Sequence, residues 1–78
     1  MKTNDYIFSS DLALVATLSL WYPIDSIDKS DPSKLVFMFR REDLIDKTIE
    51  SFWKKELMVE PLTFFNQLKI IKTRIYEH

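Results

Sequence analysis

The chain has 78 residues, no cysteine and a formal net charge of −1, so we expect a single domain, residues 1–78, with one core. Hydrophobic residues make up 46% and charged residues 29%, which is a globular balance and excludes a disordered chain. The absence of cysteine excludes disulfides, thiolate nucleophiles and cysteine-ligated metals, and it fits a cytoplasmic protein. The near-neutral charge excludes a global attraction to nucleic acid or anionic membrane.

The first strongly patterned segment is a helix predicted over residues 9–20. Ser9 or Ser10 is expected to cap its start by accepting a hydrogen bond from a free backbone N–H. Asp11 in the first turn favours the positive end of the helix dipole. The segment is apolar nearly all round, so we expect this helix either to lie at the centre of the fold or to be covered by a partner.

The same segment contains the longest apolar run of the chain, residues 12–24. It is too short to span a bilayer and is interrupted by Pro23. Acidic residues near its start and the lack of a small-residue cleavage site argue against a signal peptide. Pro23 disfavours helical geometry in the preceding residue, so the helix is predicted to end near Leu20. We expect no contact with a membrane.

Two strands are predicted next, over residues 21–27 and 34–41. The second is the stronger, because its hydrophobic residues alternate. One of its faces is fully apolar and the other partly so, which indicates cover on both sides of the strand: Leu35, Phe37 and Phe39 against Val36, Met38 and Arg40. Residues 28–33 connect the strands, and Asp31 followed by Pro32 suits a type I turn. The pattern predicts a β-hairpin with a longer loop.

Two further helices are predicted, over residues 41–56 and from Pro61 to the C-terminal region. The first has hydrophobic residues at helical spacing, with acidic residues at its start and lysines at its end. Pro61 suits the first position of the second helix. Residues 57–60 are short enough for the two helices to form a hairpin. The expected aromatic core residues are Phe37, Phe39, Phe52, Phe64 and Phe65.

These elements predict an α+β fold in which a two-stranded antiparallel hairpin packs on three helices. The expected order is α-β-β-α-α, with room for a short strand at residues 5–8. A two-stranded sheet is marginal alone, so the helices must cover it. Because the chain has no glycine, its turns are expected to depend on proline, aspartate and serine.

A longer pattern runs through the whole chain. It combines an early T-x-D-aromatic, a strand ending in F-x-F, and a C-terminal V-acid-P-x-x-F-F-N-x-x-K-x-x-K-x-x-I-Y that begins at Val59 and ends at Tyr76. In this pattern the chain resembles a small uncharacterised domain of bacteria and their phages, a domain of unknown function. The resemblance implies a phage or mobile-element setting and no particular activity. Members of that family usually have a glycine after the first helix, where this chain has Leu20, Trp21 and Tyr22.

Residue types suited to catalysis are scarce. The only histidine is His78, the last residue, so a histidine-based relay or zinc site has no support. A phosphate-binding loop needs glycine. Asp25, Asp28 and Asp31 recur at three-residue intervals, but the sharp-turn glycine and the later glutamate of a calcium loop are missing. We expect a non-enzymatic protein with no catalytic residues, no metal site and no cofactor.

Two kinds of binding remain open. The first is contact with a protein partner or with another copy of the chain. Aromatic residues typical of interfaces that lie beside proline or lysine are the candidates for it: Trp21, Tyr22 and Trp53. The alternative is nucleic-acid binding through cations of the last two helices: Lys54, Lys55, Lys69, Lys72 and Arg74. So few cations are more often ordinary solvated charges than a phosphate-binding patch, so protein contact is the favoured hypothesis.

Overall fold

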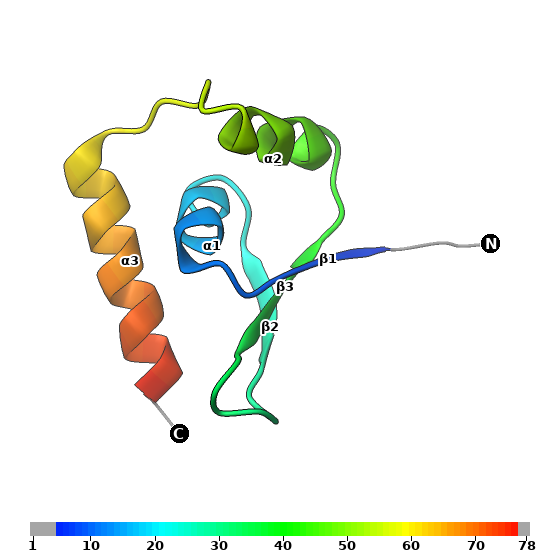
Figure 1. Ribbon diagram of the computed structural model, residues 1–78, viewed down its shortest axis with the longest axis vertical. Coiled ribbons are helices and arrows are strands. Elements are labelled where there is room, and N and C mark those ends of the chain that lie inside the picture. Colours follow the sequence, from blue (N-terminus) through cyan, green and yellow to red (C-terminus); the bar gives the residue numbers. More distant parts are fainter. Residues whose placement is uncertain (1–4, 77–78) are drawn as a thin grey trace.

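The computed structural model describes residues 5–76 as three strands and three helices in the order β-α-β-β-α-α (Figure 1). Their bounds are β1 Tyr6–Ser9, α1 Leu12–Leu18, β2 Ile24–Asp28, β3 Val36–Arg40, α2 Ile45–Trp53 and α3 Pro61–Tyr76. The strands form one antiparallel sheet in the order β1-β3-β2. In Figure 1, α1 lies at the centre, with α2 above it, α3 to its left, and the sheet below it and to its right. The α+β class is confirmed.

The sheet has three strands, so the prediction of a two-stranded hairpin was incomplete. The short segment at the start of the chain pairs with β3 as β1, placing Phe8 opposite Met38. The predicted hairpin is present as β2 and β3, with an irregularity between Ile24 and Ser26 that leaves Asp25 as an extra residue. In the chain, α1 connects β1 to β2, and α2 and α3 follow β3.

The hairpin strands are shorter than predicted. Residues 21–23 belong to the turn after α1, because the N–H groups of Trp21 and Tyr22 both donate to the Leu18 carbonyl oxygen, at 3.0 and 2.8 Å. In the connecting loop, the Lys34 N–H donates to the Asp31 carbonyl oxygen at 3.0 Å, which closes the predicted turn containing Pro32. Proline and aspartate chemistry therefore shapes this loop, as expected for a chain without glycine.

Helix α1 is capped by Asp11 rather than by Ser9 or Ser10. The Asp11 carboxylate accepts hydrogen bonds from the N–H groups of Ala13 and Leu14 at 2.9 and 3.2 Å. The sequence analysis placed Asp11 within the first turn of the helix, whereas it is the N-cap residue that precedes this turn. The helix ends at Leu18, two residues before the predicted end.

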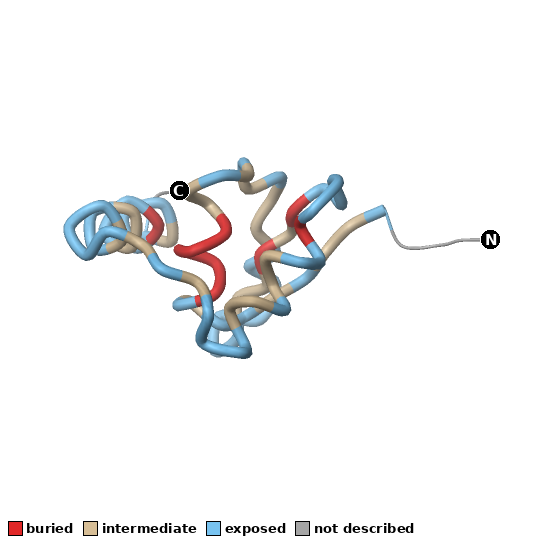
Figure 2. The backbone as a smooth tube through the Cα atoms, turned by 90° about the horizontal axis from the view of Figure 1, so that it is seen from above, coloured by how far each residue is buried: buried red, intermediate tan, exposed pale blue. Residues whose placement is uncertain are grey.

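The apolar first helix is the centre of the fold. Five consecutive residues of α1, from Leu14 to Leu18, are buried, and they form the longest buried stretch in Figure 2. Helix α1 contacts α2, α3 and β1. Its apolar circumference is therefore covered by its own chain, and the alternative that a partner covers it was wrong.

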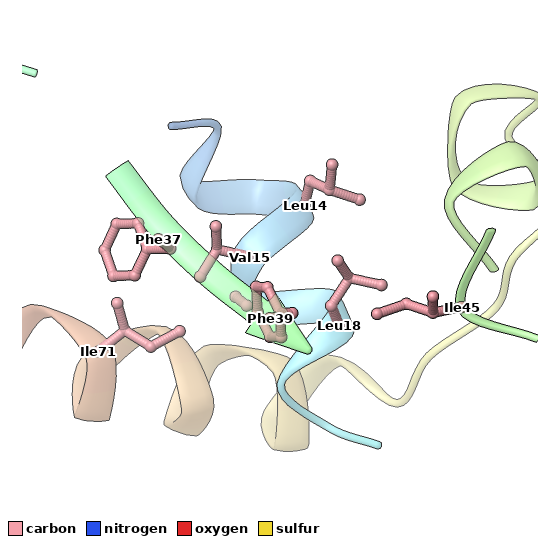
Figure 3. Packing of buried hydrophobic residues seen from close by; sticks show 8 residues of the cluster. Leu14, Val15, Leu18, Phe37, Phe39, Ile45 and Ile71 are labelled. Carbon is pink, nitrogen blue, oxygen red and sulfur yellow. The ribbon is translucent and has the colours of Figure 1, made fainter. Parts of the chain in front are cut away.

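The core is one cluster of buried hydrophobic residues drawn from α1, β3, α2 and α3: Leu14, Val15, Ala16, Leu18, Phe37, Phe39, Ile45 and Ile71. Figure 3 shows Ile71 of α3 approaching Phe37 beside Val15. The prediction of Phe37 and Phe39 as core residues is confirmed. Two others, Phe52 and Phe64, are half-buried and pack against the cluster. Phe65 is exposed, so its assignment to the core was wrong.

Helices α2 and α3 do not form the predicted helical hairpin. Each packs on α1 instead, and Figure 1 shows them on different sides of it. Helix α2 begins at Ile45, later than predicted, because Leu44 before it has a left-handed backbone with φ of 73°. Its end also uses a left-handed residue, Lys55, with φ of 61°. In a chain without glycine, a leucine and a lysine fill the two positions where glycine is usually favoured.

Candidate interaction surface

The start of α3 is fixed by the residue before it. The Glu60 carboxylate accepts hydrogen bonds from the N–H groups of Leu62 and Thr63, at 3.0 and 2.7 Å, and from the Thr63 hydroxyl at 2.8 Å. Pro61 then occupies the first helical position, as predicted. The hydrogen bonds from Leu62 and then Thr63 stabilise the ionised form and hold the pKa of Glu60 below its usual range.

Helix α3 is held to the molecule by a narrow face. Of its residues only Ile71 is fully buried, while three others are half-buried and pack against the core: Phe64, Leu68 and Ile75. This face packs on α1, and its Ile71 also approaches Phe37 of β3 (Figure 3). Most other residues of this 16-residue helix are exposed, so much of its circumference is open to solvent.

The open side of α3 is unusually apolar. Four large hydrophobic side chains on it are more than half exposed: Leu62 at 69%, Phe65 at 56%, Ile70 at 53% and Tyr76 at 79%. A single exposed hydrophobic residue on a small protein needs no explanation, but several on one helix indicate a contact surface. We call this side the free face of α3 and define it by these four residues together with Lys69 and Lys72.

The free face is also basic. Lys69 and Lys72 are exposed, and so is Arg74 on the adjoining flank. No acidic residue occurs between Pro61 and Tyr76. With 3.6 residues per turn, Phe65, Lys69, Lys72 and Tyr76 fall within about 60° of the helix circumference. Two cations therefore lie between two aromatic rings along one stripe.

The three aromatic residues predicted to bind a partner have different environments. Trp21 and Trp53 are 52% and 59% exposed. The Trp53 ring meets the Phe52 ring edge to face, with centroids 5.0 Å apart. Tyr22, in contrast, is half-buried against the core, and its hydroxyl is hydrogen-bonded to the Thr48 hydroxyl at 3.4 Å. Tyr22 therefore has a structural role in joining α1 to α2, and the two tryptophans keep exposed rings.

The predicted cations fall into two groups. Lys54 and Lys55 are exposed at the end of α2, where Lys54 Nζ lies 3.8 Å from a Glu50 carboxylate oxygen. Lys69, Lys72 and Arg74 lie in the second half of α3, at least eight residues after its start. Eight helical residues correspond to about 12 Å. The five residues therefore belong to two places, the end of α2 and the second half of α3.

The sequence prediction missed most of the apolar part of the free face. Phe65 was assigned to the core, and Leu62 and Ile70 were not singled out. A usable signal was present in the sequence, because the hydrophobic residues of α3 cover more of the helix circumference than one neighbouring helix can bury. An excess of this kind predicts exposed hydrophobic residues without identifying which of them are exposed.

The described residues also form shallow pockets. One of about 250 Å³ lies where α1, α2 and the start of α3 meet, and its lining is mainly apolar: Thr17, Phe52, Leu57, Val59 and Phe64. The Thr17 hydroxyl donates to the Ala13 carbonyl oxygen at 2.8 Å, so it is already engaged. This pocket brings together no acid, base or nucleophile with which to act on a substrate.

Acidic residues do not gather into a metal site within residues 5–76: no group of three or more histidine, cysteine or acidic residues is placed to hold an ion. Two of the loop aspartates instead cap their own turns. Hydrogen bonds from the Ser30 backbone and hydroxyl lower the pKa of Asp28. The Ser33 hydroxyl and N–H, at 2.7 and 2.9 Å, lower the pKa of Asp31. His78 lies outside the described residues.

A comparison with protein families decides the relationship suggested by the sequence pattern. The model of a domain of unknown function, DUF5659, matches residues 4–77. The chain belongs to the DUF5659 family. No curated protein and no solved structure matches the chain. Membership in the DUF5659 family therefore confirms the resemblance to an uncharacterised small domain.

Among the described helices of this DUF5659 domain, none combines the length and the apolar character needed to cross a bilayer. The longest, α3, carries three cations along its exposed side. The free face of α3 is thus the surface feature that most needs an explanation.

Proposed function

We propose that the protein is a non-enzymatic binding module that contacts a protein partner through the free face of α3. The observation that carries the proposal is the exposure of Leu62, Phe65, Ile70 and Tyr76 on a helix whose opposite side already packs on the core. Large apolar and aromatic side chains of this kind act as anchors in protein interfaces. A setting in the cytoplasm, on a phage or mobile element, belongs to the same proposal.

The exposed side chains are sufficient in size for such a contact. Fully burying a leucine or phenylalanine side chain contributes roughly 1.5–3 kcal/mol relative to leaving it exposed. Four partly exposed anchors can therefore offset much of the cost of association. The Phe65 ring is already oriented, because it meets the Phe64 ring edge to face with centroids 5.9 Å apart. Restricting its motion before binding reduces the entropy lost on contact.

Charge defines the chemistry of the partner. Lys69, Lys72 and Arg74 have no carboxylate on their own helix to neutralise them. A second α3 would bring three more cations to the contact, so a symmetric pairing of two α3 helices is disfavoured. We therefore commit to an acidic amphipathic helix, whose apolar residues meet the anchors and whose carboxylates meet Lys69 and Lys72.

The test uses two designed helical peptides with leucines at the same heptad a and d positions. One carries glutamates at the e and g positions and the other carries lysines. Fluorescence anisotropy of the labelled peptides should show binding of the acidic peptide and none of the basic peptide. Phe65→Ala should weaken the acidic complex by about 1–2 kcal/mol, a 5- to 30-fold change in Kd. Trp53→Ala is the matched control and should leave the Kd unchanged. Equal binding of both peptides, or equal loss in both variants, would contradict the proposal.

A second candidate function is binding of single-stranded nucleic acid along the same stripe. The observation that favours it is the placement of Lys69 and Lys72 between the rings of Phe65 and Tyr76, because bases stack on aromatic rings while cations meet phosphates. This candidate function uses only the predicted cations of α3, because Lys54 and Lys55 lie at the end of α2.

Salt dependence distinguishes this second candidate from the first. Two phosphate contacts to a single strand predict a slope of about −1.4 in a plot of log K against log salt concentration. Anisotropy of a labelled oligothymidine measures that slope. Binding with this slope, lost in Lys69→Gln and Lys72→Gln, would favour nucleic acid. No detectable binding at low salt would remove this candidate and leave the protein partner.

A further inference from the structure

The two edges of the sheet are built differently. The β2 edge carries Asp25 and Asp28 and is interrupted by the irregularity beside Ile24. Charges and bulges on an edge strand discourage pairing with another chain. The β1 edge has neither device, because Tyr6–Ser9 contains no charged residue and pairs with β3 without a register shift. Among residues 5–76, β1 is therefore the edge better suited to pairing with another chain.

The hydrogen-bond alternation of β1 shows which backbone groups face that open edge. The Arg41 N–H donates to the Asp5 carbonyl oxygen at 2.8 Å. Asp5 and Arg41, which face each other just outside β1 and β3, are therefore a hydrogen-bonded pair. Along an antiparallel pair of strands, hydrogen-bonded and non-hydrogen-bonded facing pairs alternate. Ile7 and Ser9 therefore bond toward β3, while the N–H and C=O groups of Tyr6 and Phe8 point away from it. Among residues 5–76 no strand lies beside those groups.

We propose that two copies of the chain associate through antiparallel pairing of their β1 strands, with the two-fold axis at Ile7. Tyr6 of each copy then faces Phe8 of the other, and each of these two pairs exchanges both backbone hydrogen bonds. The contact is isologous, as in most homodimers. It joins two three-stranded sheets into one sheet of six strands. This association uses a different surface from the free face of α3 and does not depend on the proposed function.

The side chains fit this register. Tyr6 and Phe8 lie on the same face of the sheet, and Phe8 is 60% exposed. The pairing places the Tyr6 ring of one copy against the Phe8 ring of the other, and aromatic pairs of this kind stabilise sheets. The Arg40 guanidinium lies 5.9 Å from the centre of the Tyr6 ring of the same copy. Arg40 is in β3, so it lies on the side of β1 away from the second copy. At the ends of the seam Asp5 faces Ser9, so no like charges are opposed.

A second copy is the partner that fits this edge best. Because β1 is short, a stable contact needs aromatic rings from both strands, and a second copy brings its own Tyr6 and Phe8. A shift by one residue would bring inward-pointing backbone groups to the contact. A shift by two residues would keep outward-pointing groups there but would no longer place Tyr6 against Phe8. The paired segment is short, so the interface is small and the equilibrium should depend on concentration in the range of weak complexes.

The first test compares two substitutions at one position. Phe8→Pro removes the N–H that faces the second copy, and edge strands tolerate proline at such positions. Phe8→Val removes the ring as well but keeps the N–H. Sedimentation velocity from micromolar to millimolar concentration should show the natural chain approaching twice its mass of 9.4 kDa. Phe8→Val should still associate, and Phe8→Pro should raise the Kd over Phe8→Val by about 30-fold, equivalent to two ordinary hydrogen bonds.

The second test uses disulfide cross-linking to determine which residues of the two β1 strands face each other. It does not require the protein to tolerate proline. Ile7 faces Ile7 of the second copy at a non-hydrogen-bonded pair, where Cα atoms are about 4.5 Å apart, within reach of a disulfide. The chain has no cysteine, so Ile7→Cys introduces a single thiol. With oxidised glutathione as the oxidant it should form a covalent dimer much faster than the control Asp25→Cys at the other edge. A natural chain that stays monomeric at millimolar concentration, or equal cross-linking at both edges, would overturn the proposal.

Discussion

Phe64 and Phe65 are neighbours in sequence whose ring centroids lie 5.9 Å apart in an edge-to-face contact, yet only one of the two rings packs against the core. Phe64 packs against the core, whereas Phe65 is 56% exposed. The single contact joins the interior of the protein to its free face. It also explains how an exposed ring can be held in one orientation without being buried.

The two phenylalanines should therefore respond differently to truncation. Phe64→Ala should lower the free energy of unfolding by about 2 kcal/mol, somewhat less than a fully buried phenylalanine would lose. Phe65→Ala should change it by less than about 0.5 kcal/mol, as is usual for surface positions. Urea denaturation measures both. Equal losses would mean that Phe65 is part of the core in solution.

The left-handed residue at the end of α2 gives a second prediction. The Glu56 N–H donates to the Ser51 carbonyl oxygen and the Lys55 N–H to that of Phe52, both at 3.0 Å, so the helix ends in a Schellman motif with lysine in the glycine position. Lys55→Gly should raise the free energy of unfolding by about 1 kcal/mol because the left-handed conformation costs a side chain roughly that much. The neighbouring Lys54 is right-handed. Lys54→Gly should therefore be destabilising, and a gain in both variants would contradict this explanation.

The pKa of Glu60 gives a prediction about pH. Hydrogen bonds from Leu62 and Thr63 hold this pKa below its usual range in the folded protein. The stabilisation is therefore present above the pKa of the unfolded chain and is lost as the pH falls through the folded pKa. Thermal unfolding should show Glu60→Gln less stable than the natural chain near neutral pH, with the difference shrinking below about pH 4. A difference that grows on acidification would contradict the capping role.

Ser26 gives a prediction about the sheet. Its hydroxyl is buried and finds no hydrogen-bond partner among the described residues. Burying an unsatisfied hydroxyl is costly, so Ser26→Ala should be neutral or should raise the free energy of unfolding by up to about 1 kcal/mol. The control is Ser9→Ala, because Ser9 Oγ accepts the Asp11 N–H at 3.1 Å and its loss should destabilise. A clear loss of stability in Ser26→Ala would show that its hydroxyl is satisfied in solution.

The periodicity of the sequence predicted the helices and the central strand well. Hydrophobic spacing identified α2 and α3, an almost wholly apolar segment with capping residues identified α1, and the alternation around Phe37 and Phe39 identified the strand in the middle of the sheet. These signals are strong because each depends on many residues buried on one side. The position of Pro61 was also predictable, because proline suits the first turn of a helix.

Features that depend on distant contacts were harder to predict. A short strand at residues 5–8 was predicted only as an option, and β1, Tyr6–Ser9, confirms it, but its pairing with β3 depends on tertiary structure rather than on its own pattern. The sequence also could not show that α2 and α3 both pack on α1, because a short connection allows either a helical hairpin or two separate contacts. Since the packing of α3 decides which of its apolar residues are exposed, the free face was beyond prediction for the same reason.

An NMR titration of the isotopically labelled protein with the acidic amphipathic peptide tests directly whether the free face of α3 is the binding surface. We expect amide shifts to concentrate on α3, at Leu62, Phe65, Lys69 and Tyr76, and to vanish with the basic peptide. Trp21 and Trp53 should keep their indole signals unchanged. Shifts centred on either tryptophan, or no shifts on α3 at millimolar peptide, would contradict the assignment of its free face as the binding surface.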